Sequence, residues 1–240
     1  MKEDFTDLDK IINLYYEKQK ETRVFITQLD NLYKIGHNIE INKEIPKESE
    51  YIKSRMPLEI IMKCYAILSD ITISKKHLLL STQNQEQIYF AKLICMTIHT
   101  GLEYVENIMF YLKLNSEVKD IDSLIPQLKE LYKYKTLIES VRNHSIAHID
   151  PDFTIYYDSM QNIFKIPYNE FVENFIEVIQ YIQKLGSKIN NNQLKELRKQ
   201  LKEITVSNIE IIRNDTTQSN KQELLRIYEE CYEFFNLKDV

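Results

Sequence analysis

Apolar residues recur every three or four positions along most of this chain, which is the spacing of one face of an α-helix. The segments that carry the pattern are 4–35, 58–73, 82–114, 123–148, 168–188, 194–213 and 223–235. Segment 58–73 is almost wholly apolar and is therefore expected at the centre of the fold. The pattern as a whole predicts an all-α protein.

Glycine, proline and asparagine mark where these helices are expected to begin, end or touch. Pro57 suits the first position of a helix, because its fixed backbone angle is already helical. Gly101, inside the 82–114 segment, is expected to mark a close helix–helix contact. Breaks are predicted near Tyr134 and at residues 190–192, where three asparagines follow one another.

The segment 153–166 is the stretch predicted to leave the helical pattern. Its two short apolar runs, TIYY and IFKI, flank the polar residues 158–162. Such runs on either side of a polar turn are typical of a β-hairpin. The expected fold therefore includes a short β-hairpin or extended segment at 153–166.

The chain length suits one domain with an appended element. Residues 1–190 are predicted to form the helical bundle, and residues 191–240 a C-terminal helical extension that packs on the bundle or on a second subunit. The 240 residues include only 3 Gly and 5 Pro. These are too few for a β-sandwich with many tight turns, so composition also favours long helices.

The formal net charge of −5 argues against a strongly basic nucleic-acid-binding domain. A ribonuclease, however, needs only a local basic patch. The stretch 181–213 carries seven Lys or Arg residues against three Glu, a local charge of +4. This pattern is more typical of a solvated helix face than of an RNA-binding track.

The cysteines and the first residues indicate the compartment. Cys64, Cys95 and Cys231 are far apart, each in an apolar run, and have no metal-binding spacing. Free cysteines of this kind are typical of a reducing cytosol. The first residues lack the apolar core of a signal peptide, and no apolar run reaches the roughly 20 residues of a membrane span. A cytoplasmic protein without a membrane partner is expected.

The run at 142–150, RNHSIAHID, holds the residues best suited to chemistry. Arg142 is a permanent cation that can grip a phosphate in a fork. His148, six positions later, can accept or donate a proton near neutral pH. Six residues turn an ideal helix by roughly 600°, so the two side chains lie about 120° apart unless the helix loosens. Together they have the parts of a site that cleaves phosphodiesters without metal.

Two other interpretations of these residues stay open. Arg142 could pair with Glu139, and His148 could serve as a cation at the C-terminal end of a helix. His144 and His148 share a helix face and could hold a metal with a nearby aspartate such as Asp150. The run lacks the glutamate of the HExxH motif, and no metal site is predicted.

The same run resembles the signature of the HEPN superfamily, in which an arginine is followed four to six residues later by a histidine. In that signature Asn, Asp or His often stands directly after the arginine, as Asn143 does here. The ending Ala147-His148, with Asp150 two residues further on, is similar to HEPN proteins of bacterial abortive-infection systems. The resemblance covers roughly residues 82–185.

The resemblance implies an HEPN-like antiparallel helical bundle that dimerises and brings two Arg/His pairs into one cleft. It also implies a metal-independent endoribonuclease of a phage-defence or toxin–antitoxin system, in which the RNA 2′-OH attacks the phosphate. His148 would act as general acid or base, Arg142 would stabilise charge on the phosphate, and Asn143 would orient either group. His144 and Asp150 are the expected substrate contacts, and no cofactor is expected.

The alternative function is a non-catalytic HEPN-like helical dimer that acts as a protein-interaction or regulatory subunit. The acidic net charge and the extra C-terminal helices favour this alternative. The expected partners of the enzyme are RNA and a second copy of the chain. An antitoxin or another defence protein is a further expected partner of either form.

Overall fold

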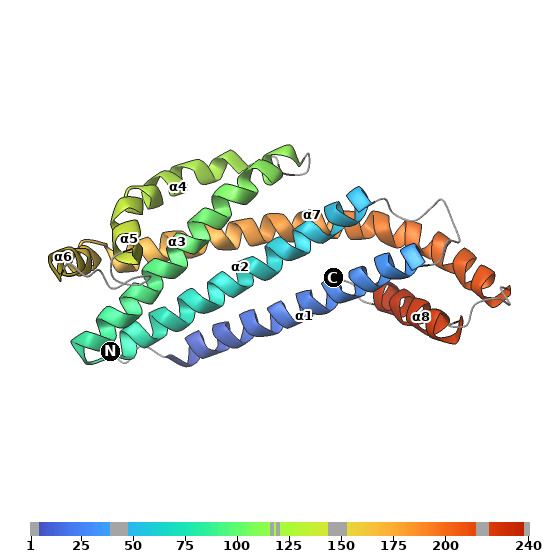
Figure 1. The fold of residues 1–240 in the computed structure, drawn as a ribbon, viewed down its shortest axis with the longest axis horizontal. Coiled ribbons are helices and arrows are strands. Elements are labelled where there is room, and N and C mark those ends of the chain that lie inside the picture. Colours follow the sequence, from blue (N-terminus) through green and yellow to red (C-terminus); the bar gives the residue numbers. More distant parts are fainter. Residues whose placement is uncertain are drawn as a thin grey trace. The chain divides into compact units, whose positions relative to one another are not determined.

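The computed structural model describes residues 5–38, 48–115, 118, 121–143, 153–214 and 221–237, and all regular structure in these ranges is helical (Figure 1). In chain order the elements are α1 (Phe5–Asn38), α2 (Glu48–Leu80), α3 (Asn84–Leu114), the 3₁₀ helix η1 (Ile121–Leu124), α4 (Ile125–Tyr132), α5 (Lys135–Val141), α6 (Phe153–Ile163), α7 (Tyr168–Asn214) and α8 (Lys221–Leu237). The prediction of an all-α protein is confirmed.

The chain divides into two compact units. The first unit comprises Met1–Gln19 and Lys63–Leu185, and the second comprises Lys20–Met62 and Gly186–Val240. The second unit therefore includes residues 20–62 together with the predicted C-terminal extension. The boundary predicted at residue 190 stays a prediction.

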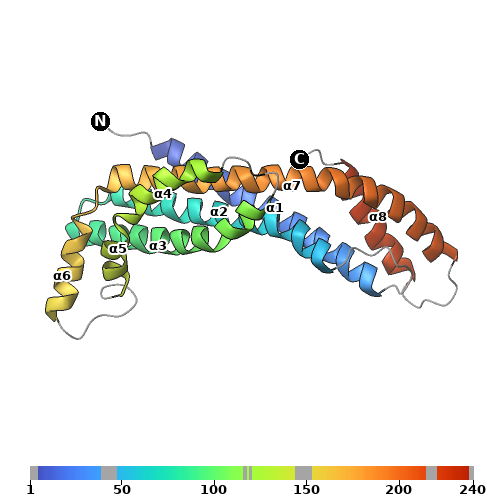
Figure 2. The same cartoon turned by 90° about the horizontal axis from the view of Figure 1, so that it is seen from above.

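The core of the first unit lies between α2, α3 and α7, which run side by side in the views of Figures 1 and 2. Lys75 of α2 pairs with Glu173 of α7, and Gln183 of α7 donates a hydrogen bond to the Tyr65 hydroxyl (3.1 Å). The largest fully buried side chains of this unit are Leu68, Ile71, Ile94, Ile98, Leu112, Leu124, Leu131, Ile138, Ile163, Phe175 and Ile179. Those of α3 follow the helical spacing read from the sequence.

At Gly101, α3 packs closely against the Phe175 side chain of α7. A Cβ atom built on Gly101 would lie 2.3 Å from Cζ of Phe175, a side chain with no exposed surface. Real carbon atoms do not approach so closely, so only glycine fits beside this ring. The prediction that Gly101 marks a close helix–helix contact is confirmed.

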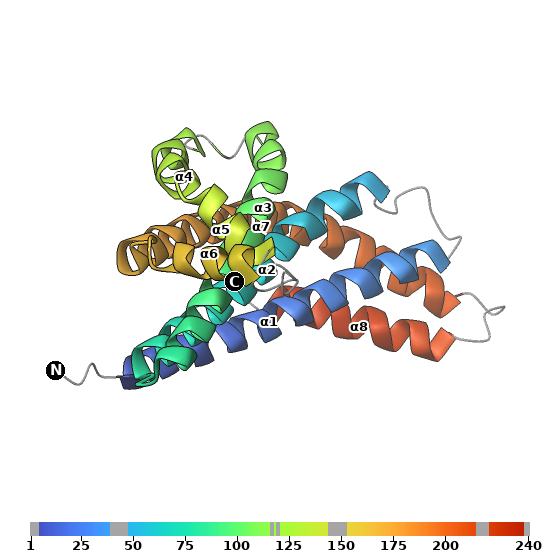
Figure 3. The same ribbon diagram turned by 60° about the vertical axis from the view of Figure 1, so that its left-hand side comes forward.

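The helix predicted at 123–148 is broken near Tyr134, as expected. α4 ends at Tyr132, a turn covers Lys133 and Tyr134, and α5 begins at Lys135. The Tyr134 ring packs edge-on against Phe171 of α7, with 5.2 Å between the ring centroids. α5 then contacts both α3 and α6 (Figure 3). The break thus sets the direction of α5, the short helix that ends at Val141.

The β-hairpin predicted at 153–166 is wrong, because residues 153–163 form α6. A helix places Tyr156, Met160 and Ile163 on one face, and Ile163 is only 2% exposed. Asn162 of α6 also donates a hydrogen bond to Ser140 of α5 (3.2 Å). In the predicted hairpin Met160 would lie in the turn, whereas in the structure residues 153–163 form a helix that packs against α5.

Two predicted helix boundaries are also wrong. α7 continues through residues 190–192, and Asn190 is buried with 4% of its surface exposed. Tertiary packing here outweighs the weak helix propensity of asparagine. α2 begins at Glu48 and not at Pro57, which lies inside the helix. A proline inside a helix removes one backbone hydrogen bond but does not always end the helix.

The second unit is held by contacts among its own parts of α1, α2, α7 and α8. Arg55 of α2 pairs with Asp30 of α1 (3.3 Å) and with Glu59 one turn further along α2 (2.7 Å). Phe25 of α1 meets Phe234 of α8 edge-on, with ring centroids 4.8 Å apart. Within the described residues of both units, no helix has the length and apolar character needed to cross a lipid bilayer.

Candidate functional site

Arg142 and Asn143 lie at the C-terminal end of α5. The Arg142 backbone is helical (φ −60°, ψ −49°), and its N–H is shared between the carbonyl oxygens of Ile138 and Glu139. The chain then widens into a π-type turn at Arg142 and Asn143. Val141, fully buried, fixes this end of α5 to the core. The first two residues of the candidate motif thus stand at a loosened helix end, where turns of this kind often accompany function.

The Arg142 side chain is half-buried, and its partner is neutral. Nη1 of Arg142 donates a hydrogen bond to Oδ1 of Asn143 (3.3 Å). In the part of the chain that the structure describes, Arg142 makes no ion pair, so the alternative pairing with Glu139 is not formed. An amide holds a guanidinium in place without cancelling its charge. Among the described residues, no carboxylate therefore neutralises Arg142.

His144, His148 and Asp150 lie outside the described residues. Their roles as acid or base and as substrate contacts stay predictions, as does the alternative metal site on His144 and His148. Among the described residues, no group of three His, Cys, Asp or Glu side chains is arranged to hold a metal ion.

A row of polar side chains joins α5 to the end of α6. Nδ2 of Asn162 donates to Oγ of Ser140 (3.2 Å), and Oδ1 of Asn162 accepts a hydrogen bond from Nζ of Lys165 (2.8 Å). Ser140 precedes Arg142 by two residues, so the row ends beside the motif. The sequence contained a signal for it, because Asn162 and Lys165 are three residues apart, one helical turn. The hairpin interpretation of 153–166 concealed that signal.

A second polar cluster anchors the other end of α5. Glu106 of α3 accepts hydrogen bonds from Lys135 (2.9 Å) and from the Tyr132 hydroxyl. The hydrogen bond from Lys135 lowers the pKa of Glu106, while burial and the bond to Glu106 raise the pKa of Tyr132 to about 12. His99, 6% exposed, places Nδ1 3.4 Å from Oε2 of Glu103.

The spacing of His99, Glu103 and Glu106 along α3 would have revealed this cluster from the sequence. The three residues follow one another at intervals of four and three, which places them on one helix face. The ion pair between Lys135 and Glu106 ties the first residue of α5 to α3. The cluster therefore holds α5 in position.

Two cysteines of the first unit's core are poor nucleophiles. Cys64 and Cys95 are 0% and 1% exposed, and burial raises their thiol pKa values to about 12 and about 11. The sulfur of Cys95 also lies 3.3 Å from the Tyr168 hydroxyl. A thiolate is the reactive form of cysteine, and these sites disfavour it. Both residues are therefore structural.

In a Cys231→Ser protein, we expect Cys64 and Cys95 to resist DTNB in the folded state, even at mildly alkaline pH. Burial blocks the reagent and keeps both thiols protonated. Absorbance should report two thiols only after guanidinium unfolds the chain. Rapid reaction of the native protein would contradict the buried positions of these side chains.

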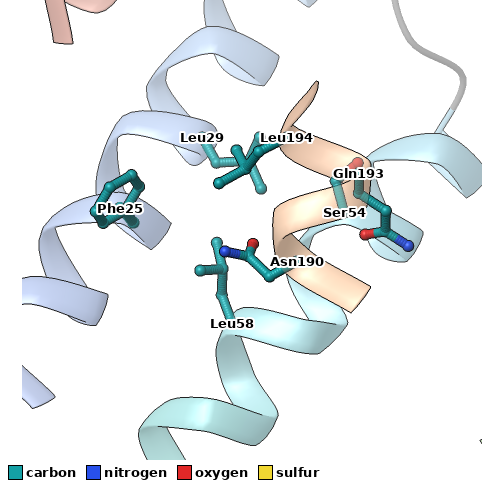
Figure 4. Close-up of a pocket in the computed structure, with 7 residues that line it drawn as sticks. All are labelled: Phe25, Leu29, Ser54, Leu58, Asn190, Gln193 and Leu194. Atoms are coloured by element: carbon teal, nitrogen blue, oxygen red, sulfur yellow. The ribbon is translucent and has the colours of Figure 1, made fainter. Parts of the chain in front are cut away.

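A pocket in the second unit is too small for a nucleotide (Figure 4). Its volume of about 10 Å³ suffices for one water molecule. Oε1 of Gln193 is buried at this pocket without a hydrogen-bond partner in the described structure, so a water is the occupant that fits. The lining residues are Phe25, Leu29, Ser54, Leu58, Asn190, Gln193 and Leu194.

Protein-family models, curated proteins and solved structures were each compared with the chain, and none of them matches it.

Proposed function

We propose that this protein is a metal-independent endoribonuclease of a bacterial phage-defence or toxin–antitoxin system. The proposal is supported by the Arg142-to-His148 run, which resembles the HEPN signature, and by the helical fold around it. The observation that carries it is the Arg142 guanidinium, held by the neutral Asn143 amide and paired with no described carboxylate. A guanidinium bonded to a neutral amide can still bind a phosphate through its remaining N–H groups.

The proposed reaction needs no metal or cofactor. The ribose 2′-oxygen attacks the adjacent phosphorus, the new P–O2′ bond forms, and the P–O5′ bond breaks. The proton of the 2′-OH is taken up by a base, and the departing 5′-oxygen receives a proton from an acid, so that the RNA neither gains nor loses a proton overall. The products are a 2′,3′-cyclic phosphate and a free 5′-hydroxyl.

Each motif residue has a role in this reaction. His148 performs proton transfer as base or acid. Arg142 stabilises the negative charge that grows on the phosphate oxygens. Asn143 orients the guanidinium through the hydrogen bond described above. His144 and Asp150 contact the substrate. Because the 2′-oxygen is the nucleophile, DNA is not a substrate.

The family resemblance places two copies of the motif in one cleft, so the proposed enzyme is a homodimer. Light scattering coupled to size exclusion should then report twice the mass of the 28.8 kDa chain. If the protein is a monomer and still cleaves RNA, the proposed dimer is wrong and the proposed enzymatic activity stands.

The central experiment incubates the purified protein with single-stranded RNA in excess EDTA. We expect cleavage with 2′,3′-cyclic phosphate ends, detected by mass spectrometry of the fragments, because no step needs a metal. A DNA strand of the same sequence should remain intact. Cleavage only with divalent metal, or fragments with 5′-phosphate ends, would contradict the mechanism. No cleavage at all would favour the non-catalytic dimer, tested by co-purification with a neighbour-encoded protein.

A further inference from the structure

Two cations near the junction of α5 and α6 are held by neutral amides. Arg142 donates to the Asn143 side chain (3.3 Å), and Lys165 donates to the Asn162 side chain (2.8 Å). The amide of Asn162 is fixed in turn by its hydrogen bond to Ser140. The Lys165 ammonium is thus two hydrogen bonds from Ser140, and Arg142 follows Ser140 by two residues.

Five other lysines of the first unit have their charge neutralised. Lys10, Lys75, Lys76, Lys133 and Lys135 each form an ion pair with a carboxylate. Lys165 forms none within the described chain, and Arg142 forms none either. The described carboxylates of α5 and α6 are Glu139 and Asp158, and neither pairs with these cations. Within the described residues, the printed partners of both cations are therefore neutral amides.

An exposed aromatic ring lies next to Lys165. Phe164 has 66% of its surface exposed, although large apolar side chains are normally covered. The turn that carries it is fixed by backbone hydrogen bonds from Phe164 to Gln161 (3.2 Å) and from Lys165 to Asn162 (3.1 Å). Because the turn is ordered, little conformational entropy is lost when its exposed ring stacks on a flat ligand.

We propose that Arg142, Asn162, Phe164 and Lys165 form a surface that binds single-stranded RNA. Lys165 contacts a phosphate next to the one that Arg142 binds, and Phe164 stacks on an unpaired base. Cations without carboxylate partners along a backbone track, with an aromatic ring for stacking, are the parts that single-strand binding requires. The choice of RNA as ligand rests on the proposed function. Lys165 is here a binding residue for substrate and takes no part in proton transfer.

The test measures binding apart from cleavage. A His148→Ala protein is titrated against a fluorescein-labelled single-stranded RNA oligonucleotide at several KCl concentrations. Adding Lys165→Met should weaken binding and reduce the slope of log affinity against log salt by about 0.7, the contribution of one single-strand phosphate contact. Lys165→Arg should restore the slope. Phe164→Ala should weaken binding by roughly 5- to 100-fold at every salt concentration, because stacking releases no counterions.

Matched controls lie elsewhere on the first unit. Lys133→Met removes an exposed lysine that is paired with Glu130, and Phe110→Ala removes a ring that is 73% exposed. Neither should change RNA affinity, and circular dichroism should show that all variants are folded. An unchanged slope for Lys165→Met, or an equal loss of RNA affinity in the control variants, would show that this surface does not bind RNA.

The two proposals can fail separately. If the wild-type protein cleaves RNA in EDTA while Lys165→Met and Phe164→Ala leave affinity unchanged, the binding surface is wrong and the enzyme stands. If the predicted changes in binding are seen but no RNA is cleaved, the surface stands and the enzyme is wrong.

Discussion

Replacing His148 with alanine should lower the rate constant of RNA cleavage by about 10²–10⁴-fold, the usual contribution of a general acid or base. Imidazole is the group of the run that can both accept the 2′-OH proton and protonate the departing oxygen at neutral pH. The measurement is single-turnover cleavage of labelled RNA with protein in excess, which separates the chemical step from product release. Affinity for RNA should change far less than the rate.

Substitutions of Arg142 should lower the cleavage rate by amounts that depend on the side chain introduced. Arg142→Ala should lower the same rate constant by about 10²–10³-fold, because a donor to the charged transition state is lost. Arg142→Lys should recover part of the loss, since it restores the charge but not the fork. Asn143→Ala should act through the guanidinium orientation and cost less than Arg142→Ala.

Controls for these variants use residues of the same type away from the motif. His77 of α2 stacks on Phe90 (4.9 Å between centroids), and His77→Ala should leave cleavage at the wild-type rate. Thermal unfolding of each variant should match that of the wild type. A folded His148→Ala protein with full activity would exclude His148 from the reaction.

Replacing Gly101 with valine should lower the free energy of unfolding by about 3 kcal/mol, the upper end of the usual range for overpacking a core. The first added carbon would already lie 2.3 Å from the Phe175 ring and 3.5 Å from Cγ2 of Ile67. Phe175 is fully buried and cannot turn away without displacing its neighbours. Urea unfolding followed by circular dichroism measures the change, with the slope showing whether the denatured state is altered.

A double-mutant cycle identifies the cause of that loss. In a Phe175→Leu background, the smaller side chain leaves room, so Gly101→Val should cost at least about 1 kcal/mol less than in the wild type. Thr100→Val, at an exposed position of α3, should stay within about 0.5 kcal/mol of the wild type. Equal costs of Gly101→Val in both backgrounds would show that Phe175 does not limit the space.

The hydrophobic pattern predicted much of the fold because most helices here have a clear helical spacing of apolar residues in their own sequence. The spacing of Ile94, Ile98 and Leu102 follows from the amino-acid order alone, and so does the break at Tyr134. The close contact at Gly101 could also be predicted, since a glycine inside a long helix weakens it unless something packs against it. Arg142 and Asn143 could be singled out because their residue types suit the proposed chemistry.

The errors came from short segments with weak local preferences. Residues 153–163 contain runs that suit a strand or a helix equally, and such runs cannot be told apart by periodicity. Their helical state depends on the apolar face offered by α5, a contact between residues 22 apart in the chain, as in the bond from Asn162 to Ser140. The three asparagines at 190–192 disfavour helix on their own, yet Asn190 is buried inside α7.

The sequence by itself determined that this protein is helical and that the predicted helix 123–148 breaks near Tyr134, because helix periodicity is a local property. It also singled out Arg142 and Asn143 as candidates, because side-chain chemistry is local too. Only the tertiary structure decided that Arg142 is held by an amide and not by Glu139, and that Lys165 reaches Ser140 through Asn162. Both contacts depend on which side chains of α5 and α6 lie next to each other. The packing of the two helices decides this, because local sequence preferences do not distinguish among the possible partners.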